Sequence, residues 1–316
     1  MGGGEQKPIV SVVMATFNRA NLLPFSTASV RWQSFTDWEL IIVDDGSTDD
    51  TAEVVRKLAA AEPRIRYVAR AKPAGEQSAA NNAGFDAARG RIIAYLNHDD
   101  LWFPDHLQGA LDHMERTGAD LSFSLPMTIA YEDGTQRFHT VNEEMRYDPT
   151  HQVPATYWVF RRELVEKYGG WRAALDVWGY PSQDRLWHWW RNGAKLYGRP
   201  ELTCLHFPSG NRPAVYSRRD DSEIAKWFAR MRDEPDLREK LLIQMVLTLG
   251  RHDNKLGRSL YRTASQWARS EWCAFLIRRG VEPQTVQHMF RFRGKGGWFA
   301  PLRAYRHQPP LDKVVQ

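Results

Sequence analysis

A polar corner in the first third of the sequence carries side chains that suit a divalent cation. Residues 92–96 form an apolar run that predicts a short buried strand, and Asn97, His98, Asp99 and Asp100 follow it directly. Carboxylate and amide oxygens are hard ligands for Mg²⁺ or Mn²⁺, ions that often carry the phosphates of a substrate. The ligands of an open α/β sheet collect at the carboxyl ends of its strands, where this corner would lie. The alternative is that Asp99 and Asp100 only cap the helix predicted after them.

Strands alternate with helices over the first 125 residues. The predicted strands are residues 9–15, 38–43, 65–69, 92–96 and 121–123. The predicted helices begin near residue 21, span 52–61 and 77–89, and follow Pro104. This alternation predicts an α/β fold with a mostly parallel, Rossmann-like sheet and helices on both faces. The dinucleotide fingerprint and the Walker A sequence are both missing, so if this domain binds a nucleotide, side chains and a metal must do more of the work.

The pattern changes after Met127. We expect a hairpin of residues 127–131 and 136–140, a helix over 162–168 that ends at a Gly pair, and a helix opening at Pro181 with Ser182 as its cap. Later helices are expected near 222–232, 235–249 and 258–279. We therefore predict an α/β domain over 1–215, in which the alternating part spans about 8–125 and a less regular part spans 126–215. A helical C-terminal region with a basic tail would span 216–316.

Composition sets the broad class of protein. Of the 316 residues, 42% are hydrophobic and 26% are charged, as in ordinary globular proteins. There is no apolar run long enough to span a membrane, no secretory start, and only two cysteines, so we expect a cytoplasmic protein. The net charge of +5 includes a basic tail that allows contact with the inner face of an anionic membrane, although a solvated tail is an equal alternative. No nucleic-acid-binding module is present.

Four polar motifs stand in order at the ends of the predicted elements. They are Ala-Thr-Phe-Asn-Arg at residues 15–19, Val-Asp-Asp-Gly-Ser-Thr-Asp at 43–49, Ala-Asn-Asn-Ala-Gly at 80–84 and Leu-Asn-His-Asp-Asp at 96–100. Together they resemble the motif series of family-two glycosyltransferases, which are nucleotide-sugar enzymes of the GT-A fold. The resemblance covers roughly residues 8–209. It implies that residues 1–215 form the catalytic domain, with a nucleotide-sugar half at about 8–125 and an acceptor half at about 126–215.

The resemblance implies a nucleoside pocket at the first two motifs. Thr16 and Asn18 would line it, and Asp44 or Asp45 would bind the base edge. A carboxylate suits the N3–H of uracil, which is a single donor between two carbonyls. The alternative is that the carboxylates of residues 44–50 only cap the next helix. We expect that role for Asp49 and Asp50, and nucleoside binding for Asp44 and Asp45.

The third motif departs from the family pattern. Asn81 stands where family members often carry Arg, so Arg19, Arg70 or Lys72 would have to supply the phosphate-facing cation. Asn82 keeps the motif's Asn and is predicted to lie in the donor site.

The corner at residues 97–100 matches the family's Asp-x-Asp metal motif, with Asn97 replacing the first carboxylate. Asn97 and His98 are expected to contact the donor. Asp99 would be the main ligand of Mn²⁺ or Mg²⁺, with Asp100 in support. His206 falls where related enzymes carry a His near the metal, but an ordinary packed histidine is equally consistent.

Asp184 matches the general base of the family's Glu-Asp motif, in which Gln183 replaces the Glu. Inverting transfer needs one carboxylate to take the proton of the acceptor hydroxyl as it attacks. The alternative role of Asp184 is a helix cap. Arg185 would flank the diphosphate or the acceptor. Trp178 or Trp187 would stack on the acceptor, although Trp at helical spacing is more often part of the core.

These residues predict a metal-dependent, inverting glycosyltransferase. A nucleotide-diphosphate sugar, with UDP favoured, would donate its sugar to a carbohydrate, lipid-linked or small-molecule acceptor. One alternative is a nucleotide-sugar-binding or docking protein with decayed catalysis, because residues 81, 97 and 183 depart from the pattern. A sugar nucleotidyltransferase is a further alternative, but it would want a glycine-rich basic loop after the first strand.

Overall fold

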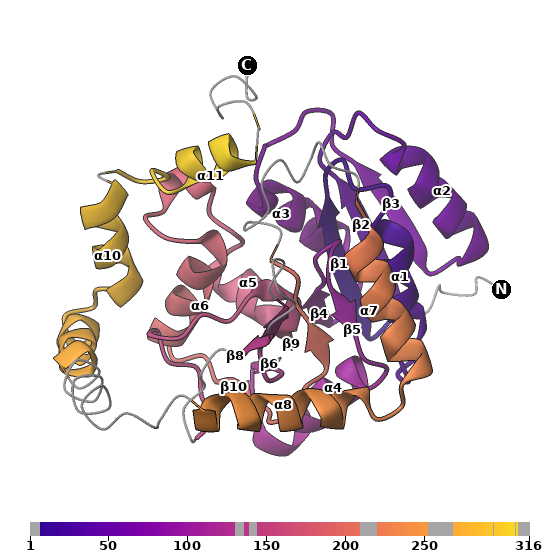
Figure 1. Cartoon of the computed structure of the whole chain (residues 1–316). Coiled ribbons are helices and arrows are strands. Elements are labelled where there is room, and N and C mark those ends of the chain that lie inside the picture. Colours follow the sequence, from indigo (N-terminus) through magenta and orange to yellow (C-terminus); the bar gives the residue numbers. More distant parts are fainter. Residues whose placement is uncertain are drawn as a thin grey trace.

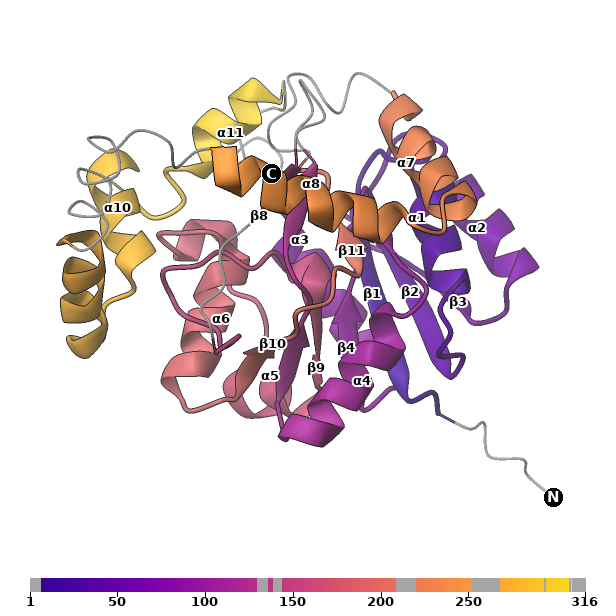
Figure 2. The same ribbon diagram turned by 60° about the horizontal axis from the view of Figure 1, so that its bottom comes forward.

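The computed structural model describes residues 7–129, 136–138, 144–208, 220–251, 268–292, 294–306 and 308. Its centre is a seven-stranded sheet with the order β10-β6-β9-β4-β1-β2-β3. Helices lie on both faces of this sheet (Figures 1 and 2). The strands are β1 Val10–Thr16, β2 Trp38–Asp44, β3 Ile65–Ala69, β4 Ile92–Tyr95, β6 Leu121–Phe123, β9 Trp158–Arg161 and β10 Leu196–Gly198. Two small pairs join β5 (Leu101–Trp102) to β11 (Cys204–Leu205) and β7 (Met127–Ile129) to β8 (Gln136–Phe138).

The first four strands pair in parallel because helices connect them. β1 pairs with β2 and β4, and β2 pairs with β3. β1, β2 and β4 are short apolar runs that are almost wholly buried, as expected for strands covered on both faces. The register sets Thr16 opposite Asp44, so the polar residues after these strands gather at one edge of the sheet.

The described helices are α1 Leu23–Arg31, α2 Thr51–Ala61, α3 Gln77–Ala87, α4 His106–Thr117, α5 Glu163–Tyr168, α6 Pro181–Arg191, α7 Ser222–Asp233, α8 Leu237–Arg251, a helix that includes residues 268–278, α10 Pro283–Phe292 and α11 Phe299–Tyr305. Those up to residue 278 follow the predicted order, whereas α10 and α11 were not predicted. Residues 258–267 of the last predicted helix lie outside the described residues. None of the described helices has the length and apolarity needed to cross a bilayer.

The five predicted strands of the first 125 residues are confirmed, but β9 was not predicted. It runs antiparallel between β4 and β6, and it is only four residues long, so no clear alternation marks it. The prediction that Ser182 caps α6 is wrong, because the N-cap is Tyr180 and no side chain caps this helix. The predicted hairpin is confirmed where it is described, by the pairing of β7 with β8, and its turn lies outside the described residues.

Aromatic side chains fill the core behind the second half of the sheet. Trp158 stacks on Trp171 with ring centroids 5.6 Å apart, and Trp189 packs on Phe160 at 5.1 Å. A second core cluster, which includes Phe103, is closed by residues of α7 and α8. In both views α7 lies beside α1 (Figures 1 and 2). The boundary near residue 216 stays a prediction, although the helices after it pack directly on the sheet domain.

Candidate active site

The end of β2 and the turn after it carry two buried carboxylates, Asp44 and Asp45, which are held in place by hydrogen bonds. Asp44 accepts the Ser47 N–H at 2.8 Å and the Tyr67 hydroxyl at 2.8 Å. Burial, with the bond to Asp44, raises the pKa of Tyr67 to about 12, so this hydroxyl remains a donor at neutral pH. A carboxylate has about four lone-pair sites, and the contacts shown fill two of those on Asp44.

Asp45 accepts more hydrogen bonds than Asp44. It accepts the Ala74 N–H at 3.0 Å and the Gly75 N–H at 3.2 Å, and it forms an ion pair with Arg70. Burial raises the pKa of Asp45, although these donors oppose the shift. Asp45 therefore fixes the loop after β3 against the end of β2.

The turn after β1 meets the turn after β2. The Asp45 N–H donates to the Thr16 carbonyl at 2.9 Å, and the Thr48 N–H donates to the Asn18 side-chain carbonyl at 2.8 Å. Asn18 has φ +50°, a conformation that Asn tolerates well. The Thr16 hydroxyl is buried with no hydrogen-bond partner. Arg19 is 2% exposed in the same turn. The four residues predicted to line the nucleoside pocket therefore lie at one edge of the sheet: Thr16, Asn18, Asp44 and Asp45.

The corner after β4 joins this edge. His98 lies against β1, with its Nδ1 3.0 Å from the Ala15 carbonyl, and burial lowers the pKa of this imidazole. Asp100 accepts the Asn97 amide at 2.8 Å and the Phe207 N–H at 2.8 Å, and it contacts His206 Nδ1 at 3.0 Å. Asp100 thereby ties the corner to the segment after β11.

A divalent ion fits this corner only in part. In the described residues no three His, Cys, Asp or Glu side chains come together as a metal site. Mg²⁺ often takes just one or two protein ligands when substrate phosphates supply the rest. Burial alone would lower the pKa of His206, but Asp100, with a contribution from Asp99, raises it above the ordinary value. In this corner His206 contacts Asp100, at 3.0 Å. A role of Asp99 and His206 in holding a metal stays a prediction.

Asp184 lies on the first turn of α6 and makes no cap. Both of its oxygens bind the guanidinium of Arg172, and the Arg172 Nε is 2.9 Å from Oδ2. The Asp184 side chain is 8% exposed and that of Arg172 is 55% exposed. The carboxylate is thus fixed by the helix, whereas its partner can swing into solvent. Arg172 was not predicted from the sequence.

Asn82 holds the loop that carries Arg172. Its side-chain carbonyl accepts the Trp171 N–H at 2.8 Å, and its amide donates to the Trp171 carbonyl at 2.9 Å. A Cβ on Gly170 would lie 2.5 Å from Asn82 Oδ1, so a larger residue there would displace the Asn82 side chain from its bonds to Trp171. Asn82 therefore connects α3 with the segment that positions Asp184.

The predicted acceptor residues lie near Asp184 in different settings. Arg185 is buried and donates to the Tyr168 and Gly169 carbonyls, at 3.2 and 2.9 Å, where α5 ends. Trp187 is 8% exposed and stacks on Trp190. Trp178 is half-buried, and its carbonyl is 3.1 Å from His288 Nδ1 of α10. Their contact with an acceptor stays a prediction.

The C-terminal region reaches the site at two points that the sequence did not reveal. Arg303 of α11 donates to the carbonyl of Gly75, whose N–H binds Asp45. Glu282, just before α10, is 5% exposed and bonded to the Thr285 hydroxyl at 2.7 Å, and its other oxygen has no partner. Burial raises the pKa of Glu282 to about 7, and the nearby charge of Asp184 adds to the shift.

Comparison with known proteins decides the family. The family model described as glycosyl transferase family 2 matches residues 11–169, which contain the nucleoside turns and the corner after β4. The chain belongs to glycosyl transferase family 2. The resemblance seen in the motifs is therefore confirmed.

One relative and two solved structures illustrate the relationship. The putative teichuronic acid biosynthesis glycosyltransferase TuaG of Bacillus subtilis is 34% identical over 144 residues, which are 45% of this chain and 56% of TuaG. The chain thus spans little more than half of that relative. The S. aureus TarS 1–349 complex with UDP-GlcNAc has a TM-score of 0.55 at 16% identity, covering 80% of this chain and 78% of TarS 1–349.

The mannosyltransferase PcManGT from Pyrobaculum calidifontis, in complex with GDP-Man and Mn²⁺, has a TM-score of 0.54 at 18% identity, covering 91% of this chain and 87% of the other. At such identities these two structures show the fold alone, and they confirm the predicted GT-A type.

Proposed function

We propose that this glycosyltransferase moves a sugar from a UDP-linked donor to an acceptor hydroxyl by direct displacement, with inversion at the anomeric carbon. The carrying observation is the common edge of the sheet, where the turns after β1, β2 and β4 meet. Two buried carboxylates lie there beside the corner after β4, where His98 contacts β1 and Asp100 contacts His206. Binding of UDP-GlcNAc by the fold-related TarS supports the choice of nucleotide.

Asp44 is the residue we assign to the base edge. The donors on Asp45 hold the loop after β3, whereas Asp44 keeps room for one more hydrogen bond. The N3–H of uracil is a single donor, and it fits that remaining acceptor site. Thr16 offers its buried hydroxyl to the same nucleoside.

Asp99 and His206 are the residues that would hold Mn²⁺ or Mg²⁺ together with the donor diphosphate. A bound ion would stabilise the negative charge that develops on the leaving nucleoside diphosphate. Presence of Mn²⁺ with GDP-Man in PcManGT supports this assignment. Asp100 keeps the His206 ring oriented through its 3.0 Å contact.

Asp184 is the residue we assign as general base. The helix start fixes its carboxylate, and Arg172 donates hydrogen bonds to both of its oxygens. Because Arg172 is more than half exposed, it can leave an oxygen free to accept the proton of the attacking hydroxyl.

Donor hydrolysis tests the proposal without a known acceptor. Purified protein is incubated with UDP-, dTDP- and GDP-sugars and Mn²⁺, and release of the nucleoside diphosphate is measured for the wild type, Asp99→Ala and Asp184→Asn. We expect one UDP-sugar to turn over, with loss of turnover in both variants and with a chelator. Failure of the folded wild type to bind any sugar nucleotide would contradict the proposal and favour the docking-protein alternative.

A further inference from the structure

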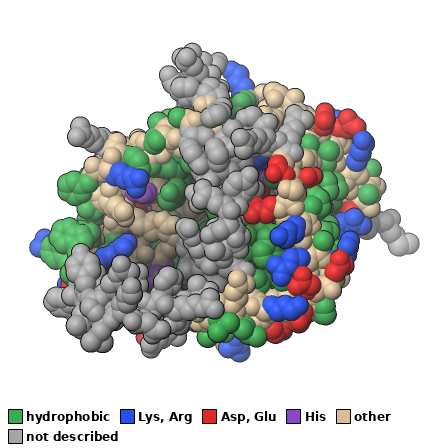
Figure 3. Space-filling view, in the orientation of Figure 1, with side chains coloured by type: hydrophobic (Ala, Val, Ile, Leu, Met, Phe, Trp, Pro, Cys, Tyr) green, Lys and Arg blue, Asp and Glu red, His purple; other side chains and the backbone are tan. Residues whose placement is uncertain are grey.

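Two C-terminal helices turn aromatic side chains toward solvent. In the helix over residues 268–278, Trp272 is 53% exposed and Phe275 is 42% exposed. In α10, Phe290 is 83% exposed and Met289 is 43% exposed. Hydrophobic side chains also gather on the side of the molecule where α10 lies in Figure 3. Exposed apolar groups that cluster in this way mark interaction surfaces.

The exposed rings are not needed for the packing of their helix. Trp272 and Phe275 are three residues apart, on one face, and they stack with centroids 5.7 Å apart. Arg279, four residues later on that face, lies over the Phe275 ring at 5.4 Å. The buried residues Cys273 and Leu276, each 7% exposed, are the ones that face the protein. The outward face is therefore apolar and cationic together.

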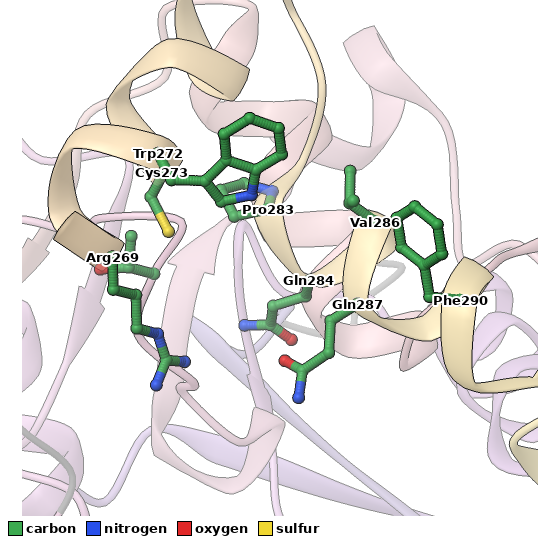
Figure 4. A pocket seen from close by; sticks show the side chains of 9 residues that line it. Arg269, Trp272, Cys273, Pro283, Gln284, Val286, Gln287 and Phe290 are labelled. Atoms are coloured by element: carbon green, nitrogen blue, oxygen red, sulfur yellow. The ribbon is translucent and has the colours of Figure 1, made fainter. Parts of the chain in front are cut away.

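The two helices enclose an open apolar groove of about 360 Å³. Trp272 and Pro283 form one side, and Val286 and Phe290 form the other (Figure 4). Arg269 extends at its edge, so a cation borders the apolar walls. A groove of this composition suits an amphiphile with a hydrocarbon part and a negative charge.

The charge of this surface favours one kind of binding partner over another. In the described residues 268–292 the exposed charged side chains are four arginines and the single carboxylate of Glu271. A second copy of the same surface would bring like charges together, which disfavours self-association. Anionic lipid headgroups attract clustered arginines, and Trp and Phe favour the boundary between headgroups and acyl chains.

We propose that the helix over residues 268–278 and α10 form a docking surface for an anionic membrane. The rings of Trp272, Phe275 and Phe290 enter the interface while the arginines bind lipid phosphates. This inference does not depend on the transfer reaction proposed above. Since His288 of α10 contacts the Trp178 carbonyl, docking would hold Trp178 close to the lipid surface. Only the assignment of Trp178 to the acceptor side rests on the proposed function.

Vesicle co-sedimentation tests the proposal with the full chain. The vesicles are phosphatidylcholine alone, or phosphatidylcholine with about one third phosphatidylglycerol. We expect binding to the anionic vesicles, and at least a tenfold lower partition coefficient for the double variant Trp272→Ser/Phe290→Ser. Ile243→Ser is the matched control, because Ile243 is 59% exposed on α8, a different helix. It should bind as the wild type does.

Charge variants and solution mass complete the test. Arg278→Gln/Arg279→Gln should reduce binding to anionic vesicles at least fivefold, with an unchanged thermal unfolding midpoint. Equal binding to both vesicle types, or to neither, would overturn the proposal. A dimer in light scattering that the Trp272→Ser/Phe290→Ser variant abolishes, without vesicle binding, would instead assign the surface to a second copy of the chain.

Discussion

The sheet edge and the C-terminal helices use their side chains in opposite ways. At the edge, Asp44, Asp45 and Asp100 are buried and each accepts two or more protein hydrogen bonds. On the C-terminal helices, Trp272 and Phe290 are more than half exposed. A buried polar group needs fixed partners, since desolvation without them is costly. An exposed ring is tolerated in water but is stabilised further by an external partner. This contrast is consistent with the two proposals, donor recognition at the sheet edge and membrane docking by the C-terminal helices.

The largest effect should come from removal of the proposed base. Asp184→Asn keeps the size of the side chain but cannot accept a proton at neutral pH. Transfer or hydrolysis should fall by about 10²- to 10⁴-fold, the usual contribution of a general base. Measurement of nucleoside diphosphate release checks this, with the exposed Glu163→Gln as control. Turnover equal to that of the wild type would exclude Asp184 as the base.

The next effect concerns stability rather than turnover. Trp189 is fully buried, between Trp158 and Phe160. Trp189→Ala should lower the free energy of unfolding by about 3–5 kcal/mol through lost transfer energy and a cavity. Urea unfolding followed by circular dichroism measures the loss. A change below about 1 kcal/mol would contradict the packing described for this half of the sheet.

Glu282, just before α10, should make the stability of the protein depend on pH. Its pKa is raised by burial to about 7 from an ordinary 4.5, so the folded state holds a proton that the unfolded state has released. Stability from this group is present below pH 4.5 and is lost as the pH rises through about 7. The expected loss is about 1–3 kcal/mol.

Unfolding free energies at pH 5 and pH 8 test the role of Glu282. Glu282→Gln should reduce the difference in unfolding free energy between pH 5 and pH 8, because Gln does not ionise. The control Glu271→Gln, at an exposed position, should leave that difference unchanged. If the wild type and Glu282→Gln showed the same difference between pH 5 and pH 8, the Glu282 carboxyl would not be the source of the pH dependence.

The smallest effect is expected at the exposed rings. Phe290→Ser should change the free energy of unfolding by less than about 0.5 kcal/mol, because an 83% exposed side chain contributes little packing. The same urea titration used for Trp189→Ala provides the comparison. A loss similar to that of Trp189→Ala would mean that Phe290 belongs to the core and would remove the basis of the docking surface.

The sequence allowed the prediction of features that depend on neighbouring residues. Apolar runs followed by polar turns located β1 to β4 and the sheet edge, and the turn residues Asp44 and Asp99 lie where the pattern indicated. Parallel pairing follows from the helices between the strands, so it was predictable as well.

Contacts between distant segments could not be predicted in this way. Asn82 binds Trp171, 89 residues later, and Arg303 binds Gly75, 228 residues earlier. No local sequence pattern indicates either pair, because only the fold brings the two partners together. Arg172 was missed for a related reason. It lies in an irregular loop, and its position is fixed by Asn82 through the neighbouring Trp171 rather than by helical or strand spacing.

Titration with UDP tests the central claim most directly, namely that the sheet edge binds the donor nucleotide and α6 supplies the base. Calorimetry would be run on the wild type, Asp44→Asn and Asp184→Asn in the presence of Mn²⁺. We predict equal dissociation constants for the wild type and Asp184→Asn, and at least tenfold weaker binding for Asp44→Asn. A folded wild type that does not bind UDP, or an Asp44→Asn variant that binds it equally well, would contradict the account.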